Sequence, residues 1–231
     1  MNEVAAIIVA GGSGKRMGMN IKKQFIELDK KPILAHTIEA FNKCRVIDEI
    51  IVVVGKEDKE KVKAEIINRY GYHKVTQIVE GGAERQDSVY NGLMAVKDGI
   101  QYVMIHDGAR PFISEEIVEK SLSMTKEKQA TVVAVPVKDT IKVVNEECEV
   151  EDTPMRSTLW SVQTPQSFKK ELLIEAYAYA KERNLTVTDD SMLVEAYGKK
   201  VYVVEGDYNN IKITTPEDLV LGQAILMSKT K

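Results

Sequence analysis

The sequence predicts an α/β fold in which helices cover both faces of a doubly wound, mostly parallel sheet. Two observations lead to this prediction. Residues 4–10 and 50–54 are unbroken apolar runs that end at a glycine, which is typical of strands buried on both faces. Segments with a helical spacing of apolar residues separate such runs, and this alternation favours parallel strands joined by crossover connections.

The individual elements follow this alternation as far as residue 137. A helix is expected to begin at Pro32, because proline suits a first helical turn and Ile38 and Phe41 continue an apolar face. By the same reasoning we expect helices at 56–70, 87–96 and 114–126, and strands at 75–79, 102–105 and 131–137.

The alternation breaks within residues 138–163. Segments 140–144 and 145–152 indicate an extended hairpin, which packs poorly by itself. We therefore expect a single domain over residues 1–231 whose hairpin projects as an arm and pairs with a second subunit; a solvent-exposed insertion in a monomer is the alternative. The remaining expected elements are helices at 168–181 and 189–197, a strand at 201–204 and a last helix with Thr215 as N-cap and Pro216 in its first turn.

A glycine-rich basic loop follows the first strand directly. It reads Gly-Gly-Ser-Gly-Lys-Arg-Met-Gly from Gly11, and Lys15, Arg16, Lys22 and Lys23 add positive charge. Ligands of open α/β sheets lie at the carboxyl ends of strands, and glycines let backbone N–H groups approach phosphate oxygens. The loop therefore predicts a site for a nucleoside triphosphate, with a mobile basic surface loop as the alternative.

Two commoner glycine motifs do not fit this loop. The dinucleotide fingerprint needs glycine where Met17 stands, and the P-loop needs Ser or Thr where Arg16 stands. A dinucleotide-dependent oxidoreductase is therefore disfavoured.

Several other residues carry chemistry at expected element ends. Asp107 would stand at a strand tip, where a carboxylate suits Mg²⁺ or a ribose hydroxyl, and Arg110 would pair with a phosphate or support Asp107; a structural ion pair is the alternative. His106 is expected to orient or pack rather than act as a base. Ser88 would reach a ribose, and Lys212, in an apolar stretch, needs an anionic partner. Threonines at element boundaries usually cap or satisfy loops, and three of them stand out: Thr140, Thr164 and Thr188.

Composition excludes other classes of function. Lys and Arg number 32 against 35 Asp and Glu, so the net charge of −3 gives no general basic surface for nucleic acid. The apolar run at 4–10 is too short for a membrane span or a signal segment. The two cysteines show no metal or disulfide spacing, which favours a cytoplasmic protein.

Taken together, the motifs resemble those of a known enzyme family. In order along residues 4–225 the chain contains Ala-Gly-Gly-Ser-Gly-Lys-Arg-Met, Lys-Lys-Gln-Phe, Gly-Gly-Ala-Glu-Arg-Gln-Asp-Ser-Val, His-Asp-Gly-Ala-Arg-Pro-Phe, Val-Pro-Val-Lys-Asp-Thr-Ile-Lys, Gln-Thr-Pro-Gln-Ser-Phe, Thr-Asp-Asp-Ser and Asn-Ile-Lys-Ile-Thr-Thr-Pro-Glu-Asp-Leu. This series is similar to that of the 2-C-methyl-D-erythritol 4-phosphate cytidylyltransferases of the non-mevalonate isoprenoid pathway. The resemblance implies a Rossmann-like nucleotidyltransferase sheet, transfer of CMP from CTP to the polyol phosphate with release of pyrophosphate, Mg²⁺ or another divalent cation, and a homodimer.

The resemblance also implies roles for individual residues. The catalytic residues would be Arg16, Lys23, Arg156 and Lys212, with Arg156 reaching from the arm into the partner's site. The nucleotide would be bound by Ala10, Gly11, Gly12, Gly14, Arg16, Lys23, Gly82, Ala83, Ser88, Asp107 and Gly108. The acceptor would contact Asp107, Arg110, Thr140, Arg156, Thr164, Thr188 and Lys212, and Asp107 would lie at the metal. Lys15 and Lys22 are expected to face solvent.

Two alternatives stay open at this point. A related cytidylyltransferase would use another polyol phosphate such as ribitol 5-phosphate, although Gly108-Ala109 and Thr-Asp-Asp-Ser favour the methylerythritol branch. A non-catalytic nucleotide sensor would keep the pocket without the acceptor-side cations. The chain departs from the family at Ala83 and Asn209, where relatives often carry aspartate.

Overall fold

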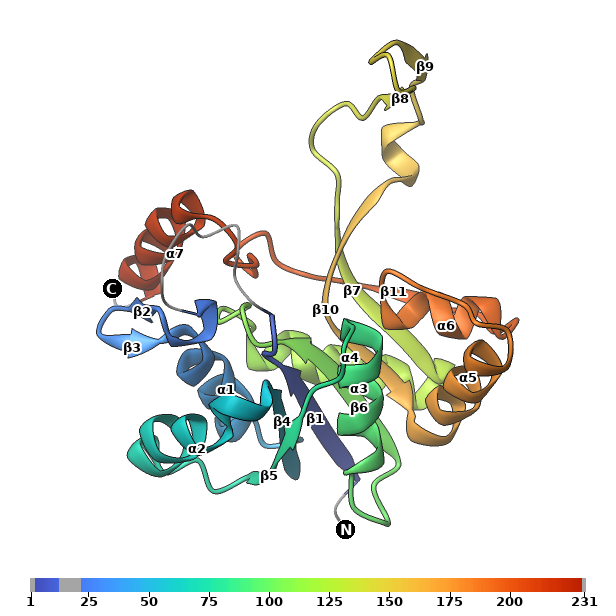
Figure 1. Cartoon of the computed structure of the whole chain (residues 1–231). Coiled ribbons are helices and arrows are strands. Elements are labelled where there is room, and N and C mark those ends of the chain that lie inside the picture. The colour runs from blue at the N-terminus through green and yellow to red at the C-terminus, as the bar shows by residue number, and fades with distance from the viewer. Residues whose placement is uncertain (1–2, 13–21, 230–231) are drawn as a thin grey trace.

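The central sheet confirms the predicted fold class. The computed structural model describes residues 3–12 and 22–229, and its main sheet has seven strands in the order β11-β7-β10-β6-β1-β4-β5, with helices on both faces (Figure 1). The strands are β1 (Val4–Val9), β4 (Glu49–Val54), β5 (Val75–Glu80), β6 (Tyr102–Asp107), β7 (Ala130–Pro136), β10 (Trp160–Lys169) and β11 (Tyr202–Glu205). All pair in parallel except β10, which is antiparallel to β6 and β7.

The helices fall close to their predicted positions. They are α1 (Ile33–Lys43), α2 (Lys59–Val62), α3 (Arg85–Met94), α4 (Glu115–Lys128), α5 (Lys170–Glu182), α6 (Asp190–Ala196) and α7 (Pro216–Lys229). The helix expected at 56–70 is instead built from the 3-10 turn η3 (Lys56–Asp58), α2 and the π-helical segment η4 (Lys63–Asn68). No helix of the described ranges is apolar over enough length to cross a bilayer.

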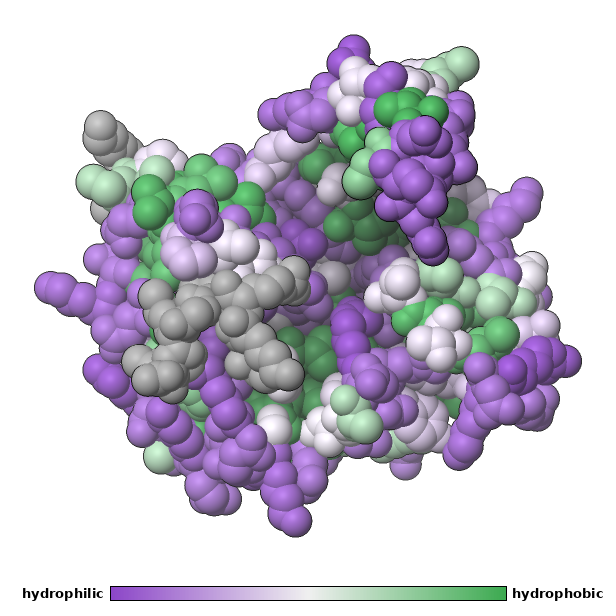
Figure 2. Space-filling model, turned by 45° about the horizontal axis from the view of Figure 1, so that its top comes forward, coloured by the Kyte–Doolittle hydropathy of each residue, from purple (hydrophilic) through white to green (hydrophobic). Residues whose placement is uncertain are grey.

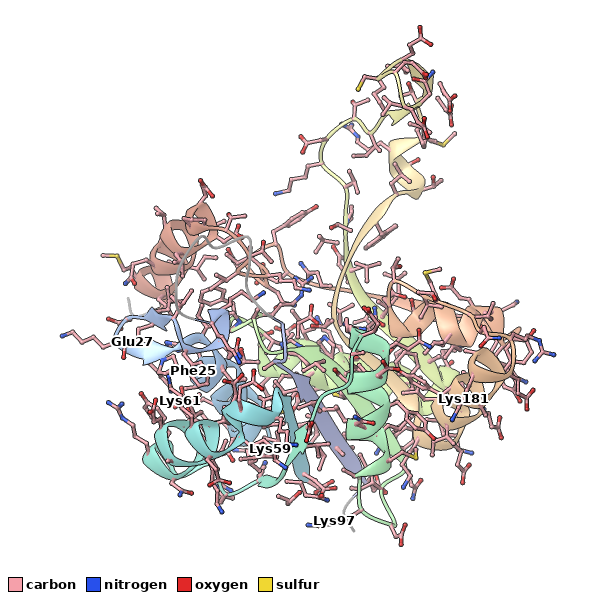
Figure 3. The ribbon with its side chains drawn as sticks, viewed as in Figure 1. Phe25, Glu27, Lys59, Lys61, Lys97 and Lys181 are labelled. Carbon is pink, nitrogen blue, oxygen red and sulfur yellow. The ribbon has the colours of Figure 1, made fainter. Side chains whose placement is uncertain are left out.

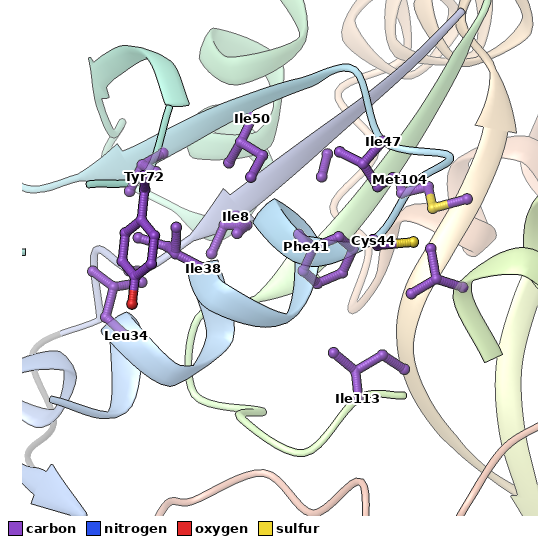
Figure 4. Packing of buried hydrophobic residues seen from close by; sticks show 14 of the residues in the cluster. Ile8, Leu34, Ile38, Phe41, Cys44, Ile47, Ile50, Tyr72, Met104 and Ile113 are labelled. Carbon is purple, nitrogen blue, oxygen red and sulfur yellow. The ribbon is translucent and has the colours of Figure 1, made fainter. Parts of the chain in front are cut away.

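Alternate residues of β1 enter two separate cores, because side chains of a strand point to opposite faces. Ile8 packs with Leu34 and Phe41 of α1 on one face (Figure 4). Ile7 packs on the other face against α3, where a Cβ at Gly92 would lie 2.5 Å from Ile7 Cγ2. Glycine at this helix position therefore lets α3 approach the sheet closely.

Strand β10 is absent from the prediction. The sequence predicts no element between the arm, which ends at residue 163, and a helix from Phe168, yet residues 160–169 form a ten-residue strand and the helix begins at Lys170. Its buried side chains are largely polar, so its sequence lacks the apolar signal of a central strand. Hydrogen bonds to other elements satisfy these buried polar side chains. Ser167 Oγ lies 2.7 Å from Ser121 Oγ of α4, and Gln166 Nε2 donates to Asp189 at 3.0 Å.

The predicted hairpin does project from the body (Figure 1). It consists of β8 (Val143–Val144) and β9 (Val150–Asp152), followed by the turn η5 (Arg156–Thr158). Its apolar side chains, among them Val150 and Met155, are exposed in the single chain. A second, smaller hairpin that was not predicted joins β2 (Glu27–Leu28) to β3 (Lys31–Pro32) ahead of α1.

Candidate active site

A cavity of about 390 Å³ opens at the carboxyl ends of β1 and β6. These two strands are neighbours although the chain forms β4 and β5 between them, so the cavity lies where the strand order reverses, as expected for ligand sites of open α/β sheets. Figure 2 shows the surface hollowed on this side, between α7 and the arm. The cavity wall consists of residues 9–12, Lys23 and Gln24 of the 3-10 turn η2 (Lys23–Phe25), residues 82–85, Ser88, residues 107–109 and Lys212.

Asp107 is the electrostatic centre of this cavity. Lys212 Nζ lies 2.8 Å from its Oδ2, Arg85 Nε lies 3.6 Å from its Oδ1, and Arg110 Nε lies 3.8 Å from its Oδ2. Burial by itself would raise the pKa of Asp107, but the charges of Lys212, Arg85 and Arg110 outweigh it and lower the pKa to about 2. The Asp107 carboxylate is therefore ionised at neutral pH.

Arg85 connects Asp107 to a second, fully buried carboxylate. Its Nη1 lies 2.8 Å from Oδ2 of Asp190, the first residue of α6, whose Oδ1 accepts a hydrogen bond from the Tyr177 hydroxyl at 3.0 Å. Burial raises the pKa of Asp190, and the Arg85 and Tyr177 contacts oppose that rise. The Arg85–Asp190 ion pair ties α3 to α6 and holds the Arg85 guanidinium at the cavity wall.

Behind Asp107, a buried hydrogen-bond chain holds the strand end. Thr164 Oγ1 accepts from the Asp107 N–H at 3.1 Å and lies 3.0 Å from His106 Nδ1, while His106 Nε2 lies 3.1 Å from the Arg110 carbonyl. The carbonyl requires a proton on Nε2, so the Thr164 hydroxyl donates to Nδ1. Burial lowers the pKa of His106 to about 4, and the neutral ring serves as an orienting group, as predicted.

The turn that leads into α3 requires a glycine at position 82. A Cβ at Gly82 would lie 2.2 Å from Asp87 Cβ, so only glycine fits. Ser88 Oγ accepts from the Gly82 N–H at 3.1 Å and donates to the Glu84 carbonyl at 3.1 Å, while Glu84 and Asp87 form a capping box. Ser88 therefore shapes the cavity wall by holding this turn.

Comparison with known proteins identifies the family. The family model described as 2-C-methyl-D-erythritol 4-phosphate cytidylyltransferase matches residues 4–228. The chain belongs to this family. The enzyme of that name from Alkaliphilus oremlandii is 52% identical over 229 residues, 99% of this chain and 97% of the relative. The crystal structure of the 4-diphosphocytidyl-2C-methyl-D-erythritol synthase from Anaerococcus prevotii superposes with a TM-score of 0.86 at 36% identity, covering 98% of this chain and 99% of that one.

A further crystal structure of the family, from Thermus thermophilus, superposes with a TM-score of 0.80 at 34% identity and covers 96% of this chain and 98% of that chain. Membership confirms the resemblance read from the motifs and makes this chain a CTP-dependent nucleotidyltransferase of the cytidylyltransferase kind. Neither the family model nor these relatives support the ribitol 5-phosphate alternative.

The fold brings many of the residues expected of a cytidylyltransferase to the cavity wall. They are Ala10, Gly11, Gly12, Lys23, Gly82, Ala83, Ser88, Asp107, Gly108 and Lys212. Gly14 and Arg16, together with Lys15, lie outside the described residues.

Other expected residues lie away from the cavity wall. Arg110 and Thr164 stand behind Asp107, and Arg110 Nη1 donates to the Asn210 carbonyl at 2.8 Å, which fastens the segment that carries Lys212. Thr188 is exposed at the start of α6, with its hydroxyl 3.0 Å from Met192 Sδ.

Two further expected residues belong to the arm. Thr140 is exposed there, and so is Arg156, which donates to the Lys138 carbonyl at 3.1 Å. Within one chain these two residues are therefore not part of the cavity.

Lys22 of the basic loop faces solvent only in part, with a side chain that is 36% exposed. Lys22 was expected to face solvent, but its Nζ is paired with Glu57 and lies 2.8 Å from Asp58 Oδ2. The hydrogen bonds that Lys22 donates to Asp58 and Glu57 raise its pKa. Lys22 is thus bound to the turn after β4.

Sequence reasoning missed Arg85 and Gln24 as cavity residues. Arg85 had a usable signal, because it opens a helix directly after the Gly81-Gly82 turn, where a side chain points toward the strand ends. Gln24 had none, since a glutamine next to Lys23 in a 3-10 turn has no periodicity to place it.

Proposed function

We propose that this cavity transfers CMP from CTP to 2-C-methyl-D-erythritol 4-phosphate, forming 4-diphosphocytidyl-2-C-methyl-D-erythritol and pyrophosphate. The observation that carries the proposal is the meeting of Gly11, Gly12, Lys23 and the Asp107–Lys212 pair in one cavity at the reversal of strand order. Backbone amides on one side and convergent cations on the other suit two phosphorylated substrates.

In this proposal the nucleotide lies between the glycines that follow β1 and the glycines that precede α3. Residues 10–12 and 82–83 place backbone at the cavity wall, which is how polar edges of a nucleotide are contacted without side chains. Lys23, with Arg16, grips the triphosphate and stabilises charge at the α-phosphorus.

The acceptor lies on the Lys212 side, and its phosphate oxygen attacks the α-phosphorus as pyrophosphate leaves. That oxygen is already an anion at neutral pH, so the reaction needs no general base, in agreement with a buried and neutral His106. Bringing two anions together is the main difficulty, and cations overcome it by positioning and by electrostatic stabilisation. Lys212 carries this role at the cavity wall, and Arg110 supports it from behind Asp107 by fastening the segment that bears Lys212.

A divalent cation fits the residues present. Among the described residues no group of three His, Cys, Asp or Glu side chains would enclose a metal by itself. Mg²⁺ often takes only one or two carboxylates together with substrate phosphates, and Asp107, ionised at any working pH, is the residue that would hold it. When bound, Mg²⁺ supplies charge neutralisation on the phosphates.

The arm completes the site from a second copy of the chain in this proposal. Its exposed apolar side chains need a covering surface, and the arm carries Arg156 and Thr140, the two expected acceptor contacts that lie far from their own cavity. A homodimer in the cytoplasm, with Arg156 holding the acceptor phosphate across the interface, follows from this arrangement.

Pyrophosphate release tests the function. The purified protein is given CTP and Mg²⁺ with either 2-C-methyl-D-erythritol 4-phosphate or ribitol 5-phosphate, and release is followed continuously. We expect turnover with the methylerythritol phosphate and none above background with ribitol 5-phosphate. Turnover with ribitol 5-phosphate alone would reassign the acceptor, and CTP binding without release under either acceptor would favour a sensor.

A further inference from the structure

Lys23 stands between two residues that share one partner. It is the first residue of η2, a single 3-10 turn at the cavity wall. Lys22 Nζ, on one side of it, lies 2.8 Å from Asp58 Oδ2, and Gln24 Nε2, on the other side, donates to the same oxygen at 3.2 Å. One carboxylate oxygen therefore binds the side chains of both residues that flank Lys23.

Asp58 is well placed to act as a fixed point. It ends the turn η3 directly after β4, and its exposed fraction is 6%. The Asp58 N–H donates to the Gly55 carbonyl at 2.9 Å, so the residue is tied to the strand end. A Cβ at Gly55 would lie 3.3 Å from Asp58 Oδ2, and glycine there leaves room for this carboxylate.

Asp58 has one buried partner, Gln24, and one partly exposed partner, Lys22. Gln24 is 4% exposed and its bond to Asp58 lies in the interior, where the net strength of a charge-assisted hydrogen bond is greatest. The preceding residue, Glu57, is exposed; of the two partners of Asp58, its carboxylate contacts Lys22 and not Gln24. Lys61 Nζ lies against the face of the ring of Phe25, the last residue of η2, 4.2 Å from the ring centroid (Figure 3).

We propose that Asp58 is a positioning residue for the transfer reaction, which sets the place of the Lys23 ammonium by binding Lys22 and Gln24 on either side of it. The inference rests on the proposed function of Lys23 as the cation on the triphosphate. Asp58 touches no substrate; it acts through the geometry of η2. A displacement of about 1 Å in a positioned group costs up to roughly 10²-fold in rate, so the effect is measurable.

A double-mutant cycle tests this coupling. Turnover is measured for Asp58→Ala, Lys23→Ala and the double variant under saturating CTP and acceptor. We expect Asp58→Ala to lower kcat about tenfold or more in the wild-type background and by less than about twofold in the Lys23→Ala background, because the lysine through which it acts is already gone. An equal loss in both backgrounds would show that Asp58 only supports the fold, and would overturn the inference.

The control and the conservative variant sharpen the result. Glu57→Gln removes the other carboxylate of the same turn and leaves the Gln24–Asp58 hydrogen bond in place. The kcat of this control variant is expected within about twofold of the wild-type value. Asp58→Asn keeps an acceptor for Gln24 and should retain more activity than Asp58→Ala; it also carries the cycle if Asp58→Ala does not fold, as judged by its Tm. Near-wild-type turnover of Lys23→Ala would instead refute the proposed function of Lys23, an outcome distinct from failure of the cycle.

Discussion

Lys212 Nζ lies 2.8 Å from Asp107 Oδ2 at the floor of the cavity. Two arginines, Arg85 and Arg110, face the same carboxylate from other elements. In the proposed reaction Asp107 would therefore stay neutralised if Lys212 turned toward the acceptor phosphate, and the 38% exposure of the Lys212 side chain gives it room to do so.

The first prediction concerns this lysine. Lys212→Ala should raise the KM for the polyol phosphate about tenfold or more, because a charge-assisted hydrogen bond contributes about 1.5–3 kcal/mol. The KM for CTP should change by less than about threefold, since Lys212 faces the acceptor. Steady-state kinetics with each substrate varied would measure both values, with the exposed Lys200→Ala as control. An equal rise in both KM values would contradict an acceptor-side role.

The second prediction concerns the cations on the triphosphate. Lys23→Ala and Arg16→Ala should each lower turnover by about 10²-fold or more, by analogy with the loss of one preorganised donor in a dry site. Single-turnover measurements of pyrophosphate release would separate this loss from product release. Turnover near the wild-type value in both variants would remove these residues from the catalytic set.

The third prediction concerns the Arg85–Asp190 pair. Arg85→Met leaves the Asp190 carboxylate, whose side chain is 1% exposed, without its cation and should lower the free energy of unfolding by about 3 kcal/mol. Adding Asp190→Asn should restore part of this loss, because the buried charge is removed. Urea denaturation of the three variants would measure it. If the double variant is no more stable than Arg85→Met, the buried charge is not the cause.

The fourth prediction concerns the pH dependence of stability. Burial lowers the pKa of His106 from the ordinary 6.5 to about 4, so between these values the unfolded chain binds the extra proton. Stability should therefore fall as pH drops from about 6.5 to about 4, by about 3 kcal/mol from His106 alone, and not further from this residue below pH 4. His36, whose pKa burial also lowers, adds in the same direction.

His106→Gln should flatten this slope relative to the wild-type protein. Urea denaturation at half-unit pH intervals would measure the slope of both proteins. Asp107 acts in a separate range: its folded-state pKa of about 2 lies below the ordinary 3.8, so its contribution is present above about pH 4 and is lost as pH falls toward 2. An unchanged slope in His106→Gln would contradict the assignment.

The fifth prediction concerns Arg156 and the proposed dimer. Co-expression of Lys23→Ala with Arg156→Ala should restore roughly one quarter of wild-type turnover, because half of the dimers are mixed and one of their two sites is intact if Arg156 acts across the interface. Val150→Asp, placed on the exposed face of the arm, should weaken dimerisation in sedimentation velocity. Absence of any recovery on co-expression would place Arg156 in its own chain's site or outside the reaction.

Local patterns were sufficient for much of the fold and for the location of the cavity. The apolar runs of β1 and β4 encode burial on both faces, and the glycines that follow β1 line the cavity. Asp107 was predicted at a strand end because an apolar run stops just before it, and it is the last residue of β6. Each of these signals lies within a few neighbouring residues.

The interior placement of β10 was decided only by tertiary structure. Its buried Gln163, Thr164 and Gln166 resemble a loop in the sequence, and they are tolerated inside because partners from other elements satisfy them. A hydrogen-bond partner from a distant segment leaves no trace in local periodicity.

The same reason applies to the site. The sequence by itself predicted a phosphate site built from glycines and from lysines and arginines near the strand ends. Only the tertiary structure decided that Arg85 joins Asp107 to Asp190 and that Asp58 holds both neighbours of Lys23. These are electrostatic contacts between residues far apart along the chain, and they exist because the sheet brings the carboxyl ends of its strands to one edge.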